Sequence, residues 1–262
     1  MESITIRGSH PVMRAILSAA ERIASADVGV LIVGEKGTGK ELLARHIHAM
    51  SPRGAQSFVR VDCQEVADAR TGTSQASALA QDLNDSGIEA DLVVRARGGT
   101  LFLDHVSALE PATQERLLSS LLGESGEKVD VRLLAAREPA DAVPACLASP
   151  GLALIELPLP ALRQRRSDIP VLVTHFLDLY GARHGVGGCV VDTEAMVHLW
   201  QYDWPGNVRE LESVIERVVV LSHNGRVYTA DLPPHIRGNN GKPRTTAAAP
   251  VTARAPGLAA LR

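Results

Sequence analysis

The sequence predicts an α/β protein in which a parallel-sheet core is followed by a small all-helical domain. Three observations lead to this fold class. Short apolar runs alternate with helical patterns from Ile4 to about Leu162, a glycine-rich turn joins one run to a helix, and the pattern after Pro160 is helical only. Strands separated by helices pair in parallel, and the helices then cover both faces of the sheet.

Five runs of apolar and β-branched residues are the predicted strands. Residues 29–33 form a continuous apolar run, which is typical of a strand buried on both faces. The other four runs are residues 57–62, 100–104, 129–135 and 153–157. Helices are expected between the strands, notably over residues 40–50 and 111–122, and the second has leucines on one face.

The predicted organisation has three parts. We expect the α/β core over residues 1–165 and the helical domain over residues 166–237, with helices beginning near Asp168, at Thr193 and at Asn207. Residues 238–262 are rich in Asn, Gly, Pro, Thr, Ala and Arg without periodicity, so we expect a disordered tail.

Composition excludes several classes of protein. With 262 residues, 45% of them apolar, the chain can bury a substantial core. A net charge of −3 and an aromatic content of 3% argue against a nucleic-acid platform, and no run reaches the length of a membrane span. Three widely spaced cysteines suggest neither a disulfide framework nor a zinc site. Because the start of the sequence lacks a basic region followed by a long apolar run, a cytoplasmic location is expected.

The glycine-rich turn has the pattern of a phosphate-binding loop. It follows a predicted strand and opens a predicted helix, so backbone N–H groups and a helix N-terminus would surround phosphate oxygens. The alternative is a glycine-rich turn without a ligand. The predicted nucleotide-binding residues of this segment are Gly34, Glu35, Lys36, Gly37, Thr38, Gly39, Lys40, Glu41 and Leu42.

The loop ends in Glu41, where the general motif has a Ser or Thr whose hydroxyl contacts Mg²⁺. With this ending, the string G-E-K-G-T-G-K-E-L-L-A-R-H-I-H resembles the AAA+ ATPase domain of bacterial sigma-54-dependent transcription activators. Three later strings, in the order that family has, carry the same resemblance. They are G-G-T-L-F-L-D (98–104), L-R-Q-R-R-S-D-I (162–169) and W-P-G-N-V-R-E-L (204–211).

The resemblance implies an AAA+ nucleotide-binding core with a helical lid, and ATP and Mg²⁺ as cofactors. Asp104 would be the Walker B aspartate that holds Mg²⁺, and Arg209 the sensor II arginine that reaches the nucleotide from the lid. On the residues alone, Asp104 could instead cap a helix, and Arg209 could pair with Glu212 or another acid.

Several positions depart from the family pattern. His105 stands where the family has the glutamate that polarises the attacking water, and Asp62 replaces its usual asparagine partner. Glu138 stands at the sensor I position, where pairing with the adjacent Arg137 would offset its charge. No Arg or Lys occurs from Glu138 through Leu162, where the family has arginine fingers, and this predicts weak hydrolysis in a homo-oligomer.

The family's sigma-54-binding loop, G-A-F-T-G-A, has no counterpart with an aromatic residue between Cys63 and Gly98. We also expect no sensory domain before Met1 and no helix-turn-helix DNA-binding domain after Ile236. The lysine and arginines of the tail could contact phosphate, but a solvated linker is the favoured interpretation.

Three functions remain open. The leading hypothesis is a degenerate family member that binds ATP or ADP, hydrolyses weakly or not at all, and regulates transcription through partners such as related AAA+ subunits in an oligomer. The second is an active ATPase that drives sigma-54 RNA polymerase, with His105 and Glu138 as unusual substitutes and a partner supplying the fingers. The third is a non-hydrolysing scaffold or anti-activator whose loop is a relic.

Overall fold

The computed structural model describes residues 6–71, 88–122, 129–148, 152, 154–221 and 225–238. Its centre is a parallel five-stranded sheet in the order β2-β3-β4-β1-β5. The strands are β1 (Gly29–Val33), β2 (Phe58–Asp62), β3 (Thr100–Asp104), β4 (Arg132–Arg137) and β5 (Leu154–Pro158). The predicted fold class is therefore confirmed. Each of the five strands begins within one of the five predicted runs.

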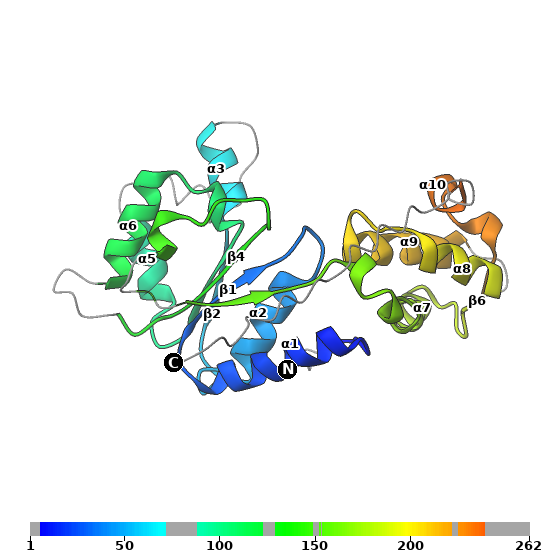
Figure 1. Ribbon diagram of the computed structural model, residues 1–262, viewed down its shortest axis with the longest axis horizontal. Helices are drawn as coiled ribbons and strands as arrows, with labels where there is room; N and C mark the ends of the chain where they lie inside the picture. Colours follow the sequence, from blue (N-terminus) through cyan, green and yellow to red (C-terminus); the bar gives the residue numbers. More distant parts are fainter. Residues whose placement is uncertain are drawn as a thin grey trace, which may run out of the picture.

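Helices cover both faces of the sheet (Figure 1). They are α1 (Pro11–Ser25), α2 (Lys40–Ala49), α3 (Cys63–Thr71), α5 (Ile88–Arg95) and α6 (Pro111–Leu122). Alternate residues of the central strands serve the two faces: Ile32 packs with α1 and α2, whereas Leu31 packs with α3, α5 and α6. This two-sided burial explains why β1 is apolar throughout.

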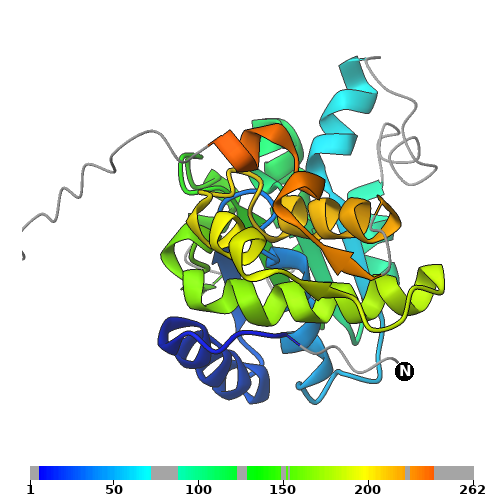
Figure 2. The same ribbon diagram turned by 90° about the vertical axis from the view of Figure 1, so that its right-hand side faces the viewer.

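The helices after β5 form a separate unit, which lies beside the α/β core in Figure 1 and in front of it in Figure 2. Its helices are α7 (Ile169–His184), α8 (Thr193–Gln201), α9 (Asn207–Leu221) and α10 (Pro234–Arg237). They enclose a second apolar core around Trp204, whose indole N–H donates to the Leu199 carbonyl at 2.8 Å. We refer to this unit as the lid.

The prediction of helices only after Pro160 was wrong in one detail. The lid contains a parallel pair of two-residue strands, β6 (Val190–Val191) and β7 (Arg226–Val227). Strands of two residues are too short to show a period-two pattern, so the sequence could not reveal them. The predicted tail lies, apart from Gly238, outside the described residues, and the boundaries at residues 165 and 237 remain predictions.

Candidate nucleotide site

The topology brings the predicted site residues to one edge of the sheet. All five strands are parallel, so their carboxyl ends meet at the same edge. The glycine-rich loop follows β1, Asp62 and Asp104 end β2 and β3, and Glu138 follows β4. Asp62 and Asp104 are direct neighbours in the sheet register.

The loop itself, residues 34–39, curls around the N-terminus of α2. Gly37 and Gly39 have φ values of +78° and +101°, which side-chain-bearing residues rarely adopt. The Lys40 ammonium donates to the carbonyls of Gly34 at 2.8 Å and Glu35 at 3.2 Å. A Cβ on Gly39 would meet no atom within 4 Å, so the loop keeps an open concave side on which phosphate oxygens fit.

Lys40 is the buried cation of this loop. Burial lowers the pKa of Lys40 below its ordinary value, while the charges of Asp104, Glu138 and Asp141 act in the opposite direction. An anionic phosphate on the open side of the loop would pair with the ammonium.

Glu41 does not point to the phosphate space as a metal ligand would. Its carboxylate pairs with Arg45 at 2.8 Å, one helical turn on, and with Arg60 of β2 at 3.0 Å. Arg60 also lies 3.2 Å from Asp62 and 3.5 Å from Asp104. Burial works to lower the pKa of Arg60, but the surrounding carboxylates, Glu41 foremost, raise it overall, so the guanidinium is the charged centre of the group.

His105 lies beside these acids and has a left-handed backbone conformation. Its φ of 51° is uncommon for a residue other than glycine. Its Nδ1 lies 3.1 Å from Asp62 Oδ1 and 3.9 Å from Asp104 Oδ1. Burial works to raise the pKa of Asp62, but the His105 hydrogen bond and neighbouring charges lower it overall. The imidazole is therefore oriented by Asp62, the residue at the position of its predicted partner.

The side chains as they lie do not fit a Mg²⁺ ion on Asp104. Mg²⁺ requires oxygen ligands at about 2.0–2.1 Å in near-octahedral geometry. The Asp104 carboxylate is 11% exposed and already paired with Arg60, and its Oδ1 accepts the His105 N–H at 3.1 Å. Asp62, Asp104 and His105 offer ligand atoms within 4.8 Å of one another, but a metal ion on Asp104 would displace or repel the Arg60 guanidinium.

The lid packs directly on the phosphate loop. A Cβ on Gly37 would lie 2.2 Å from the Gly206 carbonyl, so only glycine allows this approach. Asn207, fully buried, donates to the Lys36 carbonyl at 2.9 Å and accepts the Leu162 N–H at 2.8 Å. Its amide also donates to the Glu35 carboxylate at 3.2 Å.

Glu35 and Arg209 are the other loop and lid residues at this contact. The two terminal guanidinium nitrogens of Arg163 donate to the Glu35 carboxylate. This hydrogen bonding is the main reason why the pKa of Glu35 is lowered. The Arg209 N–H donates to the Gly37 carbonyl at 3.3 Å. Its side chain is exposed and makes no hydrogen bond or ion pair with the described residues, so the alternative pairing with Glu212 is not observed.

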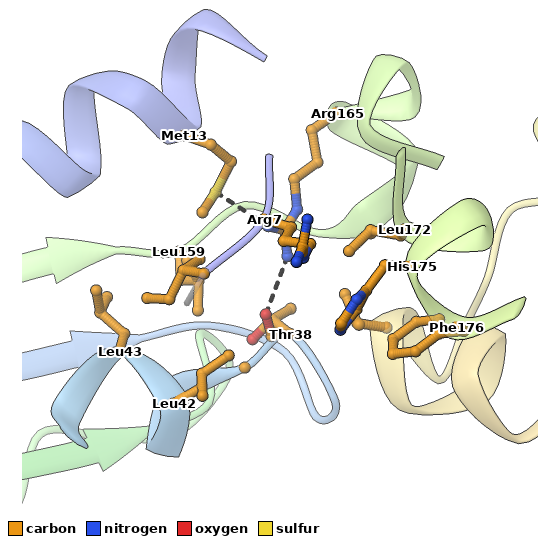
Figure 3. Close-up of a pocket in the computed structure, with 13 residues that line it drawn as sticks. Arg7, Met13, Thr38, Leu42, Leu43, Leu159, Arg165, Leu172, His175 and Phe176 are labelled. Carbon is orange, nitrogen blue, oxygen red and sulfur yellow. Dashed lines mark hydrogen bonds between the residues drawn. The ribbon is translucent and has the colours of Figure 1, made fainter. Parts of the chain in front are cut away.

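An apolar pocket opens beside the loop, between the core and the lid (Figure 3). Leu42, Leu159 and Phe176 supply apolar walls, and Arg7 and His175 supply polar groups. The pocket has a cavity volume of about 110 Å³. A planar base of a nucleotide fits such a surface when its phosphates lie on the adjacent loop.

The proposed pairing of Glu138 with Arg137 was wrong. The Arg137 guanidinium donates instead to the backbone carbonyls of Glu138 and Asp141 and lies 3.7 Å from Glu156. These backbone carbonyls engage the guanidinium, so it is not directed at the Glu138 carboxylate. The segment predicted to replace the sigma-54-binding loop falls mostly within residues 72–87, outside the described residues.

Sequence reasoning missed Arg60, Asn207 and Arg163 as site residues. Arg60 and Asp62 are two apart on one strand and so share a face, a signal that could have placed Arg60 beside the acids. Asn207 and Arg163 are more than 125 residues from Glu35 in the chain, and no local pattern joins them.

This fold and loop define a P-loop nucleotide-binding protein of the AAA+ class. A family model described as "Sigma-54 interaction domain" matches residues 6–140, and one described as "AAA+ ATPase lid domain" matches residues 163–249. The chain therefore belongs to the family of sigma-54 interaction domains. The resemblance to sigma-54-dependent transcription activators is thereby confirmed.

Individual proteins agree with this assignment. The chain is 36% identical to the transcriptional regulatory protein ZraR of Salmonella typhimurium, over 86% of this chain and 55% of ZraR. It is 35% identical to the regulatory protein AtoC of Escherichia coli, over 87% of this chain and 53% of AtoC. The crystal structure of NtrX from Brucella abortus in complex with ADP superposes with a TM-score of 0.73 at 27% identity, covering 90% of this chain and 56% of NtrX. The chain thus spans about half the length of the curated relatives it matches.

None of the helices among the described residues combines the length and apolar character needed to cross a bilayer.

Proposed function

We propose that this chain binds ATP or ADP between the phosphate loop and the lid, and regulates transcription through related AAA+ subunits with little or no hydrolysis of its own. The observation that carries the proposal is a contrast within one site. The loop with Lys40 is open toward the phosphates, whereas Asp104 is paired with Arg60 and His105 with Asp62.

The binding half of the proposal rests on the loop, the pocket and the relatives. Lys40 and the backbone N–H groups of residues 37–40 would hold the phosphates, and the pocket lined by Leu159 and Phe176 would hold the base. NtrX, which shares the fold, has been crystallised with ADP and with ATP. Arg209, on the first turn of α9, would reach the phosphates from the lid.

The hydrolytic half rests on what surrounds Asp104. A water that attacks the terminal phosphate needs a general base in place and a stabilised charge in the transition state. The family's glutamate is replaced by His105, and Glu138, which follows β4, adds a carboxylate at the predicted sensor I position. Both features work against a rapid phosphoryl transfer, and the absence of Arg or Lys over residues 138–162 removes a second source of stabilisation.

The test is a titration of fluorescent ADP and ATP analogues with a phosphate-release assay on the same samples. We expect a dissociation constant of about 1 μM or lower, which corresponds to a binding free energy of about −8 kcal/mol or stronger. We expect no release of phosphate over the same period. Lys40→Ala should abolish binding, and Arg217→Ala, which removes an exposed charge from the lid, should not. Absence of binding to the unaltered chain would refute the proposal.

The partner half needs a mixing experiment. Adding the chain to a ring-forming sigma-54 activator should change that activator's rate of phosphate release, and Lys40→Ala should weaken the effect. An activator whose rate is unchanged at every ratio would refute regulation through shared oligomers.

The second candidate function is an active ATPase that drives sigma-54-dependent initiation. The hydrogen bond that His105 Nδ1 donates to Asp62 Oδ1 favours it, because a carboxylate that orients an imidazole is a common way to prepare a general base. Turnover that disappears both in His105→Ala and in Asp104→Ala would establish this function in place of the first.

A further inference from the structure

Arg60 occupies the centre of an acidic group at the carboxyl edge of the sheet. Its guanidinium lies within 3.0–3.5 Å of carboxylate oxygens of Glu41, Asp62 and Asp104. These acids come from α2, β2 and β3, so elements distant in the chain converge on one cation. The Arg60 side chain remains 32% exposed, whereas those of Asp62 and Asp104 are only 13% and 11% exposed.

Two carboxylates that are largely shielded from solvent and lie side by side need a cation. Asp62 and Asp104 are register neighbours on adjacent parallel strands, and little solvent screens their repulsion. In a nucleotide site of this class that cation is a divalent metal ion, which the terminal phosphates bring with them. Here the Arg60 side chain already supplies a positive charge, because its Nη2 donates to Asp62 Oδ2 at 3.2 Å and lies 3.5 Å from Asp104 Oδ2.

A guanidinium and a divalent ion cannot both use Asp104 without cost. Mg²⁺ bound to Asp104 would lie within a few ångströms of Arg60, and two cations at that distance repel strongly where water is scarce. The Arg60 side chain also has two further carboxylates that retain it in place.

We propose that Arg60 is a built-in counter-cation at the Walker B aspartate, so that this site takes the metal-free form of a nucleoside di- or triphosphate. Bound divalent ions then contribute little to nucleotide affinity. The inference rests on the proposed nucleotide binding, and it adds the form of the ligand and the residue that selects it.

The experiment measures how tightly a divalent ion joins the protein–nucleotide complex. The full chain is saturated with ADP in a chelator-treated buffer, and Mn²⁺, which prefers the same oxygen ligands as Mg²⁺, is titrated while its free signal is followed by electron paramagnetic resonance. For the unaltered chain we expect a Mn²⁺ affinity within about twofold of that for free ADP, because the protein adds no ligand.

Variants separate the charge from the fold. Arg60→Ala should tighten Mn²⁺ binding about tenfold or more. The variant removes the repulsion between the guanidinium and the metal ion, and it frees the carboxylates of Asp62 and Asp104 for the ion. Arg60→Lys keeps the charge and should stay close to the unaltered chain. Arg45→Ala is the matched control, because Arg45 also pairs with Glu41 but makes no ion pair with Asp104. The double change Arg60→Ala with Asp104→Asn should remove the gain.

Three results would overturn the inference. One is tight Mn²⁺ binding by the unaltered ADP complex that is lost in Asp104→Asn. Another is an Arg60→Ala variant that remains folded by circular dichroism and binds Mn²⁺ no better than the unaltered chain. Absence of ADP binding to the unaltered chain would overturn the proposed function itself, which distinguishes that failure from a failure of the metal-free site.

Discussion

Replacement of Asn207 by alanine tests how the lid is fastened to the phosphate loop. The change removes the amide that joins Leu162, Glu35 and Lys36, and it leaves the Leu162 N–H without its acceptor in a fully buried place. An orphaned buried donor costs about 1–3 kcal/mol. Asn207 also has a φ of 54°, and alanine in that left-handed region costs about 1–2 kcal/mol.

The two costs can be measured separately. Asn207→Gly removes the same hydrogen bonds but adopts the left-handed backbone freely, so it should carry only the first cost. We therefore expect Asn207→Ala to lower the free energy of unfolding by about 2–5 kcal/mol and Asn207→Gly by about 1–3 kcal/mol.

Urea unfolding followed by tryptophan fluorescence is the suitable assay. The chain has two tryptophans, Trp200 and Trp204, and both lie in the lid, so their emission reports lid unfolding. Far-ultraviolet circular dichroism on the same samples reports the whole chain. If Asn207→Ala unfolded at the same urea concentration as the unaltered chain, the hydrogen bonds would be unimportant. Equal losses in the alanine and glycine variants would refute the backbone argument.

Further predictions concern the same contact and the lid core. The folded-state pKa of Glu35 is lowered from its ordinary 4.5, chiefly by the Arg163 hydrogen bond. The stabilisation that the Glu35 carboxylate provides is therefore complete above pH 4.5 and is lost as the pH falls through the lower folded-state pKa. Glu35→Gln should remove this pH dependence, so that its urea midpoint changes less below pH 4.5 than that of the unaltered chain. Gly37→Ala should separate the lid from the loop and abolish nucleotide binding in the fluorescence titration. Gly98 has a similar φ of +73°, but a Cβ there would meet no atom within 4 Å. Gly98→Ala should therefore cost only about 1 kcal/mol in urea unfolding and leave nucleotide binding unchanged. Trp204→Ala should destabilise the lid by about 3–5 kcal/mol in thermal unfolding by circular dichroism, because it empties the largest buried position of that core; a shift within the error of the unaltered chain would show that the lid does not depend on it.

The alternation of strands and helices was visible in the sequence because each element carries its own periodic signal. Residues 29–33 are buried on both faces and therefore apolar throughout, and α9 begins at Asn207 as its apolar spacing predicts. The phosphate loop was equally visible, because a tight turn around an anion needs glycine at fixed positions within one short segment. Two-residue strands such as β6 left no comparable signal.

The sequence by itself determined the fold class, the family, and the loop from Gly34 to Glu41, since all of these depend on local patterns and on motifs in a fixed order. Only the tertiary structure decided what the charged groups do. Arg60 is set among three carboxylates by the pairing of β2 with β3 and by the packing of α2, and Asn207 reaches the loop because the chain returns to it about 170 residues later. Charge interactions depend on distance in space and on burial, and neither quantity can be read from positions along the chain.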